Sequence, residues 1–315
     1  MGYIEEKEAE WKKKIIPQCA KEDFWEFWQK QVAEMRKIPL RVERKRLESP
    51  YDRYFLTDEI TFNTHDNTMV KAWFSYPVHK VKDKLPCVAQ FHGGGGRRER
   101  HVEMLATGVC EFAMDVRSQG GASPDQASYD IDFRGRIATR GVLSPDNYYL
   151  KNIYLDAIRA MDVIATLPEV DTKKIVTSGI SQGGALSIVA SALSGRSIQC
   201  FAACPSYNCL KQRVENGSGI FEATKGFLTR NPDYTDQVFD TLSYFDVNNM
   251  VSYVEVPTTV HLGMIDPICL PQFVYSVWTH AKNKKKLWVS PFTAHVASRE
   301  YTLYRHGELA KLLDD

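Results

Sequence analysis

The segment "TSGISQGGALS", Thr177 to Ser187, places one serine, Ser181, between two glycines, Gly179 and Gly183. An apolar run, "KIVTSG", leads into it, and a run of small residues, "GALSIVASAL", leads out of it. The first run is typical of a buried strand and the second of a helix. In a sharp strand-to-helix turn, side chains two residues before and after the serine would clash, and glycine removes that clash. The pattern therefore predicts that Ser181 stands above a sheet, beside a helix N-terminus.

Ser181 can have two roles in this position. It is either a nucleophile, held where backbone N–H groups favour developing negative charge, or a serine that caps the helix. Because strand, motif and helix follow one another in register, we favour the nucleophile. The backbone N–H of Gln182 is then one donor of an oxyanion hole. The second donor is expected from the loop after an early strand, where "FHGGGG", Phe91 to Gly96, is found; a merely flexible glycine loop is the alternative.

A serine nucleophile needs an oriented base, and in enzymes with this turn the acid and then the histidine follow the serine along the chain. "TTVHLGMIDPICLP" places Asp266 just after a strand and before a helix. Asp246, in "YFDVNN", is a rival acid, but it lies before that strand. We therefore expect Asp266 to be the acid, with a role as a helix cap as its alternative.

The base is expected to be His295. It lies in "KLWVSPFTAHVAS", in the loop between the last strand and the last helix. The other downstream histidines fit less well, because His261 lies inside a strand and His280 and His306 lie within helices. A surface loop residue is the alternative interpretation of His295.

The rest of the chain alternates short apolar strands with helical segments, which predicts an α/β fold with a mostly parallel sheet covered by helices on both faces. We expect one domain over residues 1–315. Residues 1–50 form an N-terminal helical extension, in which aromatic residues recur at helical spacing in "EDFWEFWQKQVAEM". Residues of about 208–250 form a helical insertion over the active site, before the acid loop.

Composition narrows the function. Forty basic and thirty-nine acidic residues give a net charge of +1, which argues against nucleic acid or an anionic membrane as partner. The charged first residues lack the apolar region of a signal peptide, and the apolar runs have strand length. Seven cysteines form no Cys-x-x-Cys pair, and we interpret Cys200, Cys204 and Cys209 as small buried residues and not as a metal site. Together these features predict a cytoplasmic protein.

By these motifs the chain resembles the acetyl xylan esterase and cephalosporin C deacetylase family of carbohydrate esterases. The resemblance covers most of the chain. The ordered motifs that carry it are "DFWEFW", "FHGGGG", "DVRSQGG", "TRGVLSPDNYYLKNIYLDAIRAMDVIATLPEVD", "GISQGG", "LSYFDVNN" and "GMIDPICLP".

The resemblance implies an α/β-hydrolase fold, a triad of Ser181, His295 and Asp266, no organic cofactor, and ring-like homohexamers in the cytoplasm. It implies Gly94 as the second oxyanion donor, where the family commonly has tyrosine. It further implies that Arg117 and Gln119 support the site, and that Val296 stands where the family usually has glutamate. We add Gly93 and Tyr207 as candidates for substrate contact.

The predicted function is removal of acetyl groups from small substrates, such as acetylated xylo-oligosaccharides and cephalosporin C. Two alternatives stay open. One is an esterase, thioesterase or peptidase of the same fold for other acyl groups, which the glycine in the oxyanion loop favours. The other is a non-catalytic binding protein on a hydrolase fold.

Overall fold

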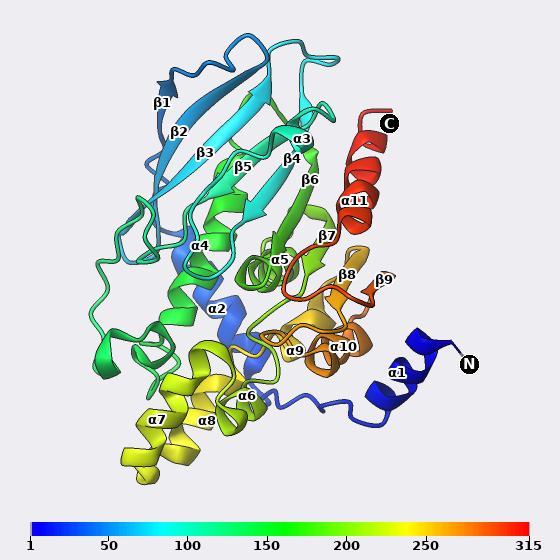
Figure 1. Ribbon diagram of the computed structural model, residues 1–315. Coiled ribbons are helices and arrows are strands. Elements are labelled where there is room, and N and C mark those ends of the chain that lie inside the picture. Colours follow the sequence, from blue (N-terminus) through cyan, green and yellow to red (C-terminus); the bar gives the residue numbers. More distant parts are fainter. Residues whose placement is uncertain (1, 315) are drawn as a thin grey trace.

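A nine-stranded sheet forms the centre of the molecule in the computed structural model, which describes residues 2–314 (Figure 1). The strand order is β1-β2-β3-β5-β4-β6-β7-β8-β9, and β5, β4 and β6 to β9 run parallel. β1, β2 and β3 pair antiparallel with one another and form one side of the sheet, where β3 pairs antiparallel with β5. The strands are β1 (Glu43–Leu47), β2 (Phe55–Asn63), β3 (Met69–Pro77), β4 (Leu85–Phe91), β5 (Cys110–Met114), β6 (Val170–Ile180), β7 (Ser197–Ala203), β8 (Thr258–Gly263) and β9 (Lys284–Ser290).

Helices cover both faces of this sheet, as the sequence predicts. In β4, Cys87 and Ala89 face the large core under α4 and α5, whereas Val88 faces the smaller core under α3 and α11. This alternation follows from the two-residue period of a strand. The helices are α1 (Tyr3–Lys12), α2 (Phe24–Arg36), α3 (Val102–Leu105), α4 (Tyr149–Ile164), α5 (Gln182–Leu193), α6 (Leu210–Asn216), α7 (Glu222–Arg230), α8 (Thr235–Ser243), α9 (Val247–Met250), α10 (Pro271–His280) and α11 (Arg299–Lys311). Short 3-10 turns are η1 (Phe133–Gly135), η2 (Ile137–Thr139), η3 (Gly219–Phe221), η4 (Pro232–Tyr234) and η5 (Val251–Tyr253).

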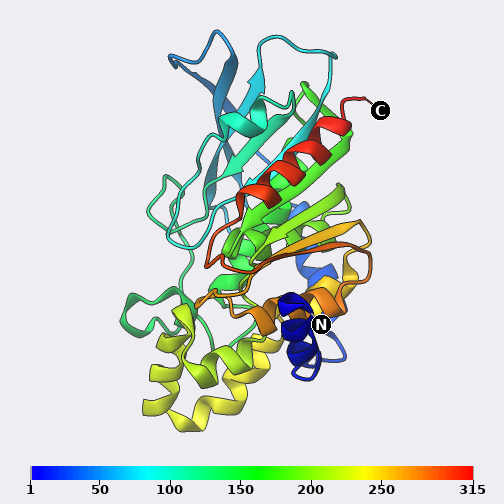
Figure 2. The same cartoon turned by 45° about the vertical axis from the view of Figure 1, so that its right-hand side comes forward.

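The predicted helical insertion is present between β7 and β8, where α6 to α9 gather at the end of the molecule opposite β1–β3 (Figures 1 and 2). The N-terminal extension is also present. Its helix α2 buries Phe24 and Trp28, and the Trp28 indole N–H donates to the Tyr244 carbonyl over 2.8 Å. The extension thus packs on the insertion through aromatic side chains.

Two elements had no clear signal in the sequence. Strand β1 is the exposed edge of the sheet and reads "ERKRL", because charged side chains are tolerated where one strand edge and much of the surface face water. Helix α1 stands away from the sheet and is anchored by Trp11, whose ring lies 5.6 Å from that of Tyr275 in α10 (Figure 1). None of the helices between residues 2 and 314 combines the length and apolar character needed to cross a membrane.

Candidate active site

Ser181 occupies a strained turn between β6 and α5. Its backbone has φ 59° and ψ −120°, a conformation that residues other than glycine rarely adopt. The turn is held by hydrogen bonds from the Ser181 N–H to the Ala203 carbonyl (2.9 Å) and from the Ser206 N–H to the Ser181 carbonyl (3.0 Å). Strain of this kind places the serine side chain above the parallel strands.

The two glycines of the motif are sterically required. A Cβ on Gly183 would lie 1.9 Å from the Phe91 carbonyl oxygen, and a Cβ on Gly179 would lie 2.4 Å from the Gly183 carbonyl carbon. These contacts are with backbone atoms, which a side-chain rotation cannot relieve. The clash argument made from the sequence therefore applies to both positions.

Asp266 and His295 meet at the carboxyl ends of β8 and β9. His295 Nδ1 lies 2.8 Å from Asp266 Oδ2, while the backbone N–H groups of Ile268 and Cys269 donate to Asp266 Oδ1 over 2.8 and 2.9 Å. Burial alone would raise the pKa of Asp266, but the hydrogen bond from His295 and those from the backbone lower it. The carboxylate therefore stays ionised and faces the imidazole.

The same hydrogen bond changes the basicity of the imidazole. The bond to Asp266, followed by the nearby Cys269, raises the pKa of His295 to about 9, against the opposing effect of burial. Asp266 holds Nδ1, so Nε2 is the nitrogen left for proton exchange with a substrate or nucleophile.

Ser181 and His295 line the same cavity, whose volume is about 1060 Å³. Over residues 2–314, no hydrogen bond joins Ser181 Oγ to His295. Hydrogen bonds between catalytic groups are often long in the absence of substrate. Gly93, Gly94 and Tyr207, the other residues expected near the substrate, line this cavity as well.

The rival acid and the other histidines are held in structural contacts elsewhere in the fold. Asp246 is buried and accepts hydrogen bonds from the backbone N–H groups of Cys209, Leu210 and Asn248. Burial raises its pKa to about 6. It caps the start of α9, and no hydrogen bond joins it to His295 in the described part of the chain. His261 is fully buried in β8, with Cys204 Sγ 3.4 Å from Nδ1 and Ser290 Oγ 3.0 Å from Nε2. The remaining downstream histidines, His280 and His306, lie in α10 and α11.

Gln119 and Gln182 form a buried network beside Ser181. Their side-chain amides exchange two hydrogen bonds, from Gln119 Nε2 to Gln182 Oε1 (2.7 Å) and from Gln182 Nε2 to Gln119 Oε1 (2.9 Å). Tyr207 Oη also donates to Gln182 Oε1, over 2.6 Å. The Gly95 N–H donates to Gln119 Oε1 over 3.0 Å. One network therefore joins the glycine loop to the residue that follows Ser181.

The glycine loop is also braced by His92. The Val116 N–H donates to His92 Nε2 over 2.9 Å, which leaves the proton on Nδ1 to donate to the Gly93 carbonyl at 2.7 Å. Burial lowers the pKa of His92, so the ring is neutral. Gly95 has φ 72°, and a Cβ on Gly94 would meet no atom within 4 Å. The loop is therefore ordered, with open space beside Gly94.

Arg117 lies below this network and is completely buried. Its guanidinium group makes two hydrogen bonds of 2.7 Å to Asp156 and also pairs with Asp66. The Arg117 carbonyl accepts from Tyr149 Oη (2.7 Å), and the same Oη accepts from Gln119 Nε2 (3.0 Å). Arg117 thus supports Gln119 from beneath and does not line the cavity.

The far parts of the cavity could not be predicted from the sequence. Its remaining walls come from η1 and η2, in the loop before α4, and from η3 and α7 in the insertion. These segments are packed together by Phe133 and Phe227, whose rings lie 5.8 Å apart, and by a hydrogen bond from Thr224 Oγ1 to the Ala138 carbonyl. Because they meet only in the folded chain, no local sequence pattern identifies them.

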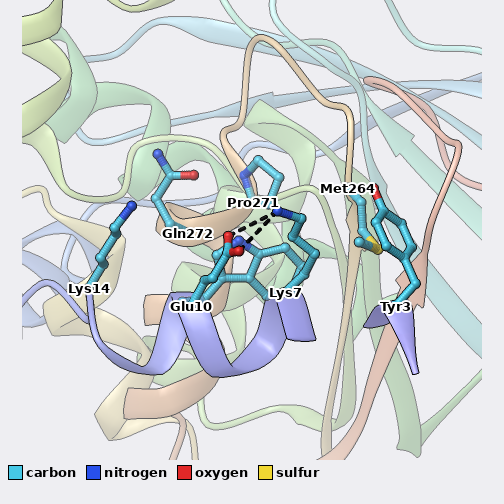
Figure 3. A pocket seen from close by; sticks show the side chains of 8 residues that line it. Tyr3, Lys7, Glu10, Lys14, Met264, Pro271 and Gln272 are labelled. Carbon is cyan, nitrogen blue, oxygen red and sulfur yellow. Dashed lines mark hydrogen bonds and ion pairs between the residues drawn. The ribbon is translucent and has the colours of Figure 1, made fainter. Parts of the chain in front are cut away.

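A second, smaller pocket of about 270 Å³ lies between α1 and the start of α10 (Figure 3). Lys7 and Glu10, three residues apart on α1, form an ion pair of 3.0 Å on one wall, and Tyr3 and Met264 also line the pocket. Ser181 and His295 are absent from its lining. The larger cavity is therefore the candidate active site.

A mostly parallel sheet, a strained serine at a strand-to-helix turn, and an acid–histidine pair after the last two strands together define the α/β-hydrolase class. Residues 10–311 match the acetyl xylan esterase (AXE1) family. The chain belongs to this family of carboxylic ester hydrolases.

Known proteins of similar sequence and structure agree with this assignment. The acetyl esterase Axe7A of Xylanibacter ruminicola is 26% identical over 287 residues, which are 89% of this chain and 64% of that protein. The chain thus spans under two thirds of the length of this relative. The acetyl xylan esterase from Paenibacillus sp. R4 superposes with a TM-score of 0.91 at 27% identity, covering 96% of this chain and 98% of that one. Acetyl xylan esterase 1 from Thermoanaerobacterium sp. JW/SL YS485 gives 0.86 at 25% identity, with coverage of 95% and 96%.

Proposed function

We propose that this chain is a serine esterase that removes acetyl groups from small substrates, such as acetylated xylo-oligosaccharides and cephalosporin C-like esters. The observation that carries the proposal is the 2.8 Å contact between His295 Nδ1 and Asp266 Oδ2, beside a cavity that Ser181 also lines. Membership of the acetyl xylan esterase family supports acetyl esters as the substrate class.

In this proposal Ser181 Oγ attacks the ester carbonyl carbon while His295 Nε2 takes its proton. Asp266 holds the imidazole in the reactive tautomer and stabilises the imidazolium that forms. The backbone N–H groups of Gln182 and Gly94 donate to the oxyanion of the tetrahedral intermediate. His295 then protonates the leaving alcohol. A water molecule, deprotonated by His295, releases acetate from Ser181.

The proposal is tested by acetate release from acetylated xylo-oligosaccharides and from cephalosporin C. Ser181→Ala is expected to reduce turnover by roughly 10³- to 10⁶-fold. Ser128→Ala is a matched control, because Ser128 is exposed and its hydroxyl makes no hydrogen bond within residues 2–314. Full activity of Ser181→Ala would overturn the proposal.

The open space beside Gly94 favours a second candidate, an esterase for longer acyl groups. A chain-length series of p-nitrophenyl esters distinguishes the two. A sharp fall in kcat/KM beyond acetate or propionate supports the deacetylase, and a flat series supports the alternative. A non-catalytic binding protein would hydrolyse none of these esters.

We also propose that the chain assembles as a homo-oligomer, a hexamer by its family resemblance. Exposed apolar side chains in the loop that carries His295 support self-association: Phe292 is 82% exposed and Val296 56% exposed, and Tyr3 of α1 stacks on Phe292 with ring centroids 6.2 Å apart. Light scattering coupled to size-exclusion chromatography tests this directly, and a monomeric mass would contradict it.

A further inference from the structure

The cavity wall carries an excess of positive charge. Arg134, Arg136 and Arg230 line the cavity together with Ser181, and Glu222 is the one carboxylate in the lining. In the described part of the chain, none of these three arginines lies within 4.0 Å of a carboxylate. Arg140, a few residues further along, pairs with Asp132 at 3.2 Å. The three arginines that line the cavity therefore differ from Arg140, because their charges are not paired with a carboxylate among the described residues.

Two of these arginines are held on one aromatic ring. The Cζ atoms of Arg134 and Arg230 lie 5.2 and 5.6 Å from the ring centroid of Phe133, within the range of cation–π contacts. The two side chains come from different elements, η1 and α7, so the fold brings like charges together across the wall. Two cations on one wall attract an anion bound beside them.

The backbone supports the same interpretation. Arg134 has φ 58° and ψ 31°, a left-handed conformation that is unusual for a long side chain and that recurs at functional sites. Arg230 Nη1 donates to the Gly226 carbonyl over 3.0 Å, which restrains its side chain over Phe133. The Arg230 side chain is therefore restrained, while both arginines are exposed at the cavity wall.

We propose that this wall binds a carboxylate on the alcohol part of the substrate, so that the preferred substrates are acetyl esters of acidic sugars, of the uronate kind. Guanidinium groups bind carboxylates through paired hydrogen bonds. An acetyl group is too small to carry a second charge, so the anion belongs to the leaving alcohol. A cavity of about 1060 Å³ has room for such an alcohol beside the acetyl group. This inference rests on the proposed function.

A matched pair of substrates tests it: acetylated glucuronate, which carries the carboxylate, and acetylated glucuronamide, which is neutral and of nearly the same shape. At low salt the wild type is expected to favour the glucuronate by about tenfold or more in kcat/KM, since hydrogen bonds to charged groups are the stronger kind. The preference is expected to shrink as ionic strength rises.

The double variant Arg134→Gln/Arg230→Gln is expected to bring this ratio of kcat/KM close to one. Arg53→Gln is the matched control, because Arg53 is exposed at the other end of the sheet and also lies 5.6 Å from a ring centroid, that of Tyr54. A ratio near one in the wild type, or a ratio that the double variant leaves unchanged, would overturn the inference.

Two further measurements separate this inference from the proposed function. Hydrolysis of neutral acetylated xylo-oligosaccharides reports the esterase activity alone, so its absence counts against the proposed function. Calorimetry of Ser181→Ala with glucuronate and with glucuronamide reports the arginine wall without any catalysis. Equal affinity for the two sugars would count against carboxylate binding by the arginine wall, and tighter binding of glucuronate would support it.

Discussion

Gln119 and Gln182 are locked to each other by two hydrogen bonds, of 2.7 and 2.9 Å, between their side-chain amides. Gln119 Oε1 also accepts from the Gly95 N–H at 3.0 Å. Gln182, which follows Ser181, and the glycine loop are distant in sequence, and both are thereby fixed to the Gln119 side chain. Gln119 is therefore a positioning residue for the proposed oxyanion hole.

Gln119→Leu is expected to lower kcat for acetyl esters by roughly 10- to 100-fold, less than the loss of an oxyanion donor itself. KM is expected to change little, because the substrate does not touch Gln119 in this account. Steady-state kinetics measures the split. Gln31→Leu is the control, since Gln31 is half-buried, its side chain bonds Asp146, and neither residue lines the cavity. A raised KM with unchanged kcat would contradict a positioning role.

The Asp266–His295 pair sets the pH dependence. His295 must be neutral to act as a base, and its pKa is raised to about 9 by the Asp266 hydrogen bond. The kcat/KM is therefore expected to rise with pH towards about 9. In Asp266→Asn the acid limb should move to lower pH, with turnover reduced by roughly 10⁴-fold. If the acid limb of the kcat/KM profile stays at the same pH in Asp266→Asn, a group other than His295 titrates there.

The pair also links stability to pH. Since the pKa of His295 is raised on folding, its stabilising effect is complete below about 6.5 and is lost as pH rises through about 9. Since the pKa of Asp266 is lowered, its effect is present above about 4 and is lost as pH falls further. Urea unfolding of the wild type and of Asp266→Asn, repeated across this pH range, measures both changes in the free energy of unfolding.

Gly183→Ala is expected to destabilise the fold strongly, because its methyl group would lie 1.9 Å from the Phe91 carbonyl oxygen. A cost above about 4 kcal/mol, or failure to fold, is expected for such a backbone clash. Gly307→Ala is the matched control. Gly307 lies in α11, with nothing within 4 Å of an added Cβ, and alanine should stabilise that helix by about 0.5–1 kcal/mol. Equal free energies of unfolding for the two variants would contradict this steric account.

Arg117→Gln is expected to cost about 3–5 kcal/mol of unfolding free energy, because it leaves the buried Asp156 without its cation. Arg196→Gln provides the comparison. Arg196 is 39% exposed in its side chain, and its partner Asp162 keeps a second arginine, Arg36, at 3.1 Å. That variant should lose at most about 1 kcal/mol. Chemical denaturation of both proteins tests the contrast.

Gly94→Tyr is expected to fit the loop without moving the backbone, since a Cβ there meets no atom within 4 Å. The added ring would narrow the cavity and reduce hydrolysis of p-nitrophenyl butyrate relative to the acetate. Gly95→Ala is the comparison. It is expected to strain the backbone of the loop, because Gly95 has φ 72°. An unchanged butyrate-to-acetate ratio in Gly94→Tyr would show that this loop does not limit the acyl group.

Local patterns were enough to predict the sheet, the helices on both faces and the insertion. Ser181, Asp266 and His295 could be proposed because each follows a recognisable strand, and the ends of parallel strands converge at one edge of the sheet. Strand β1 was missed because its residues are charged and exposed, so it has no apolar period to recognise.

The surroundings of Ser181 could not be predicted in the same way. The contacts of Gln119 with Gln182 and of Phe133 with Arg230 join residues 63 and 97 positions apart in the chain. They form only when the loop before α4 and the insertion pack over the sheet. Sequence order therefore indicated the candidate catalytic groups, while the walls of the candidate active site depend on the tertiary fold.

The central claim, that Ser181 is the nucleophile, is tested most directly by labelling with a serine-reactive phosphonate and locating the adduct by peptide mass spectrometry. We expect a single adduct on Ser181 in the wild type, slower labelling in His295→Ala and no adduct in Ser181→Ala. An adduct at another serine, or full esterase activity after Ser181 is removed, would contradict it.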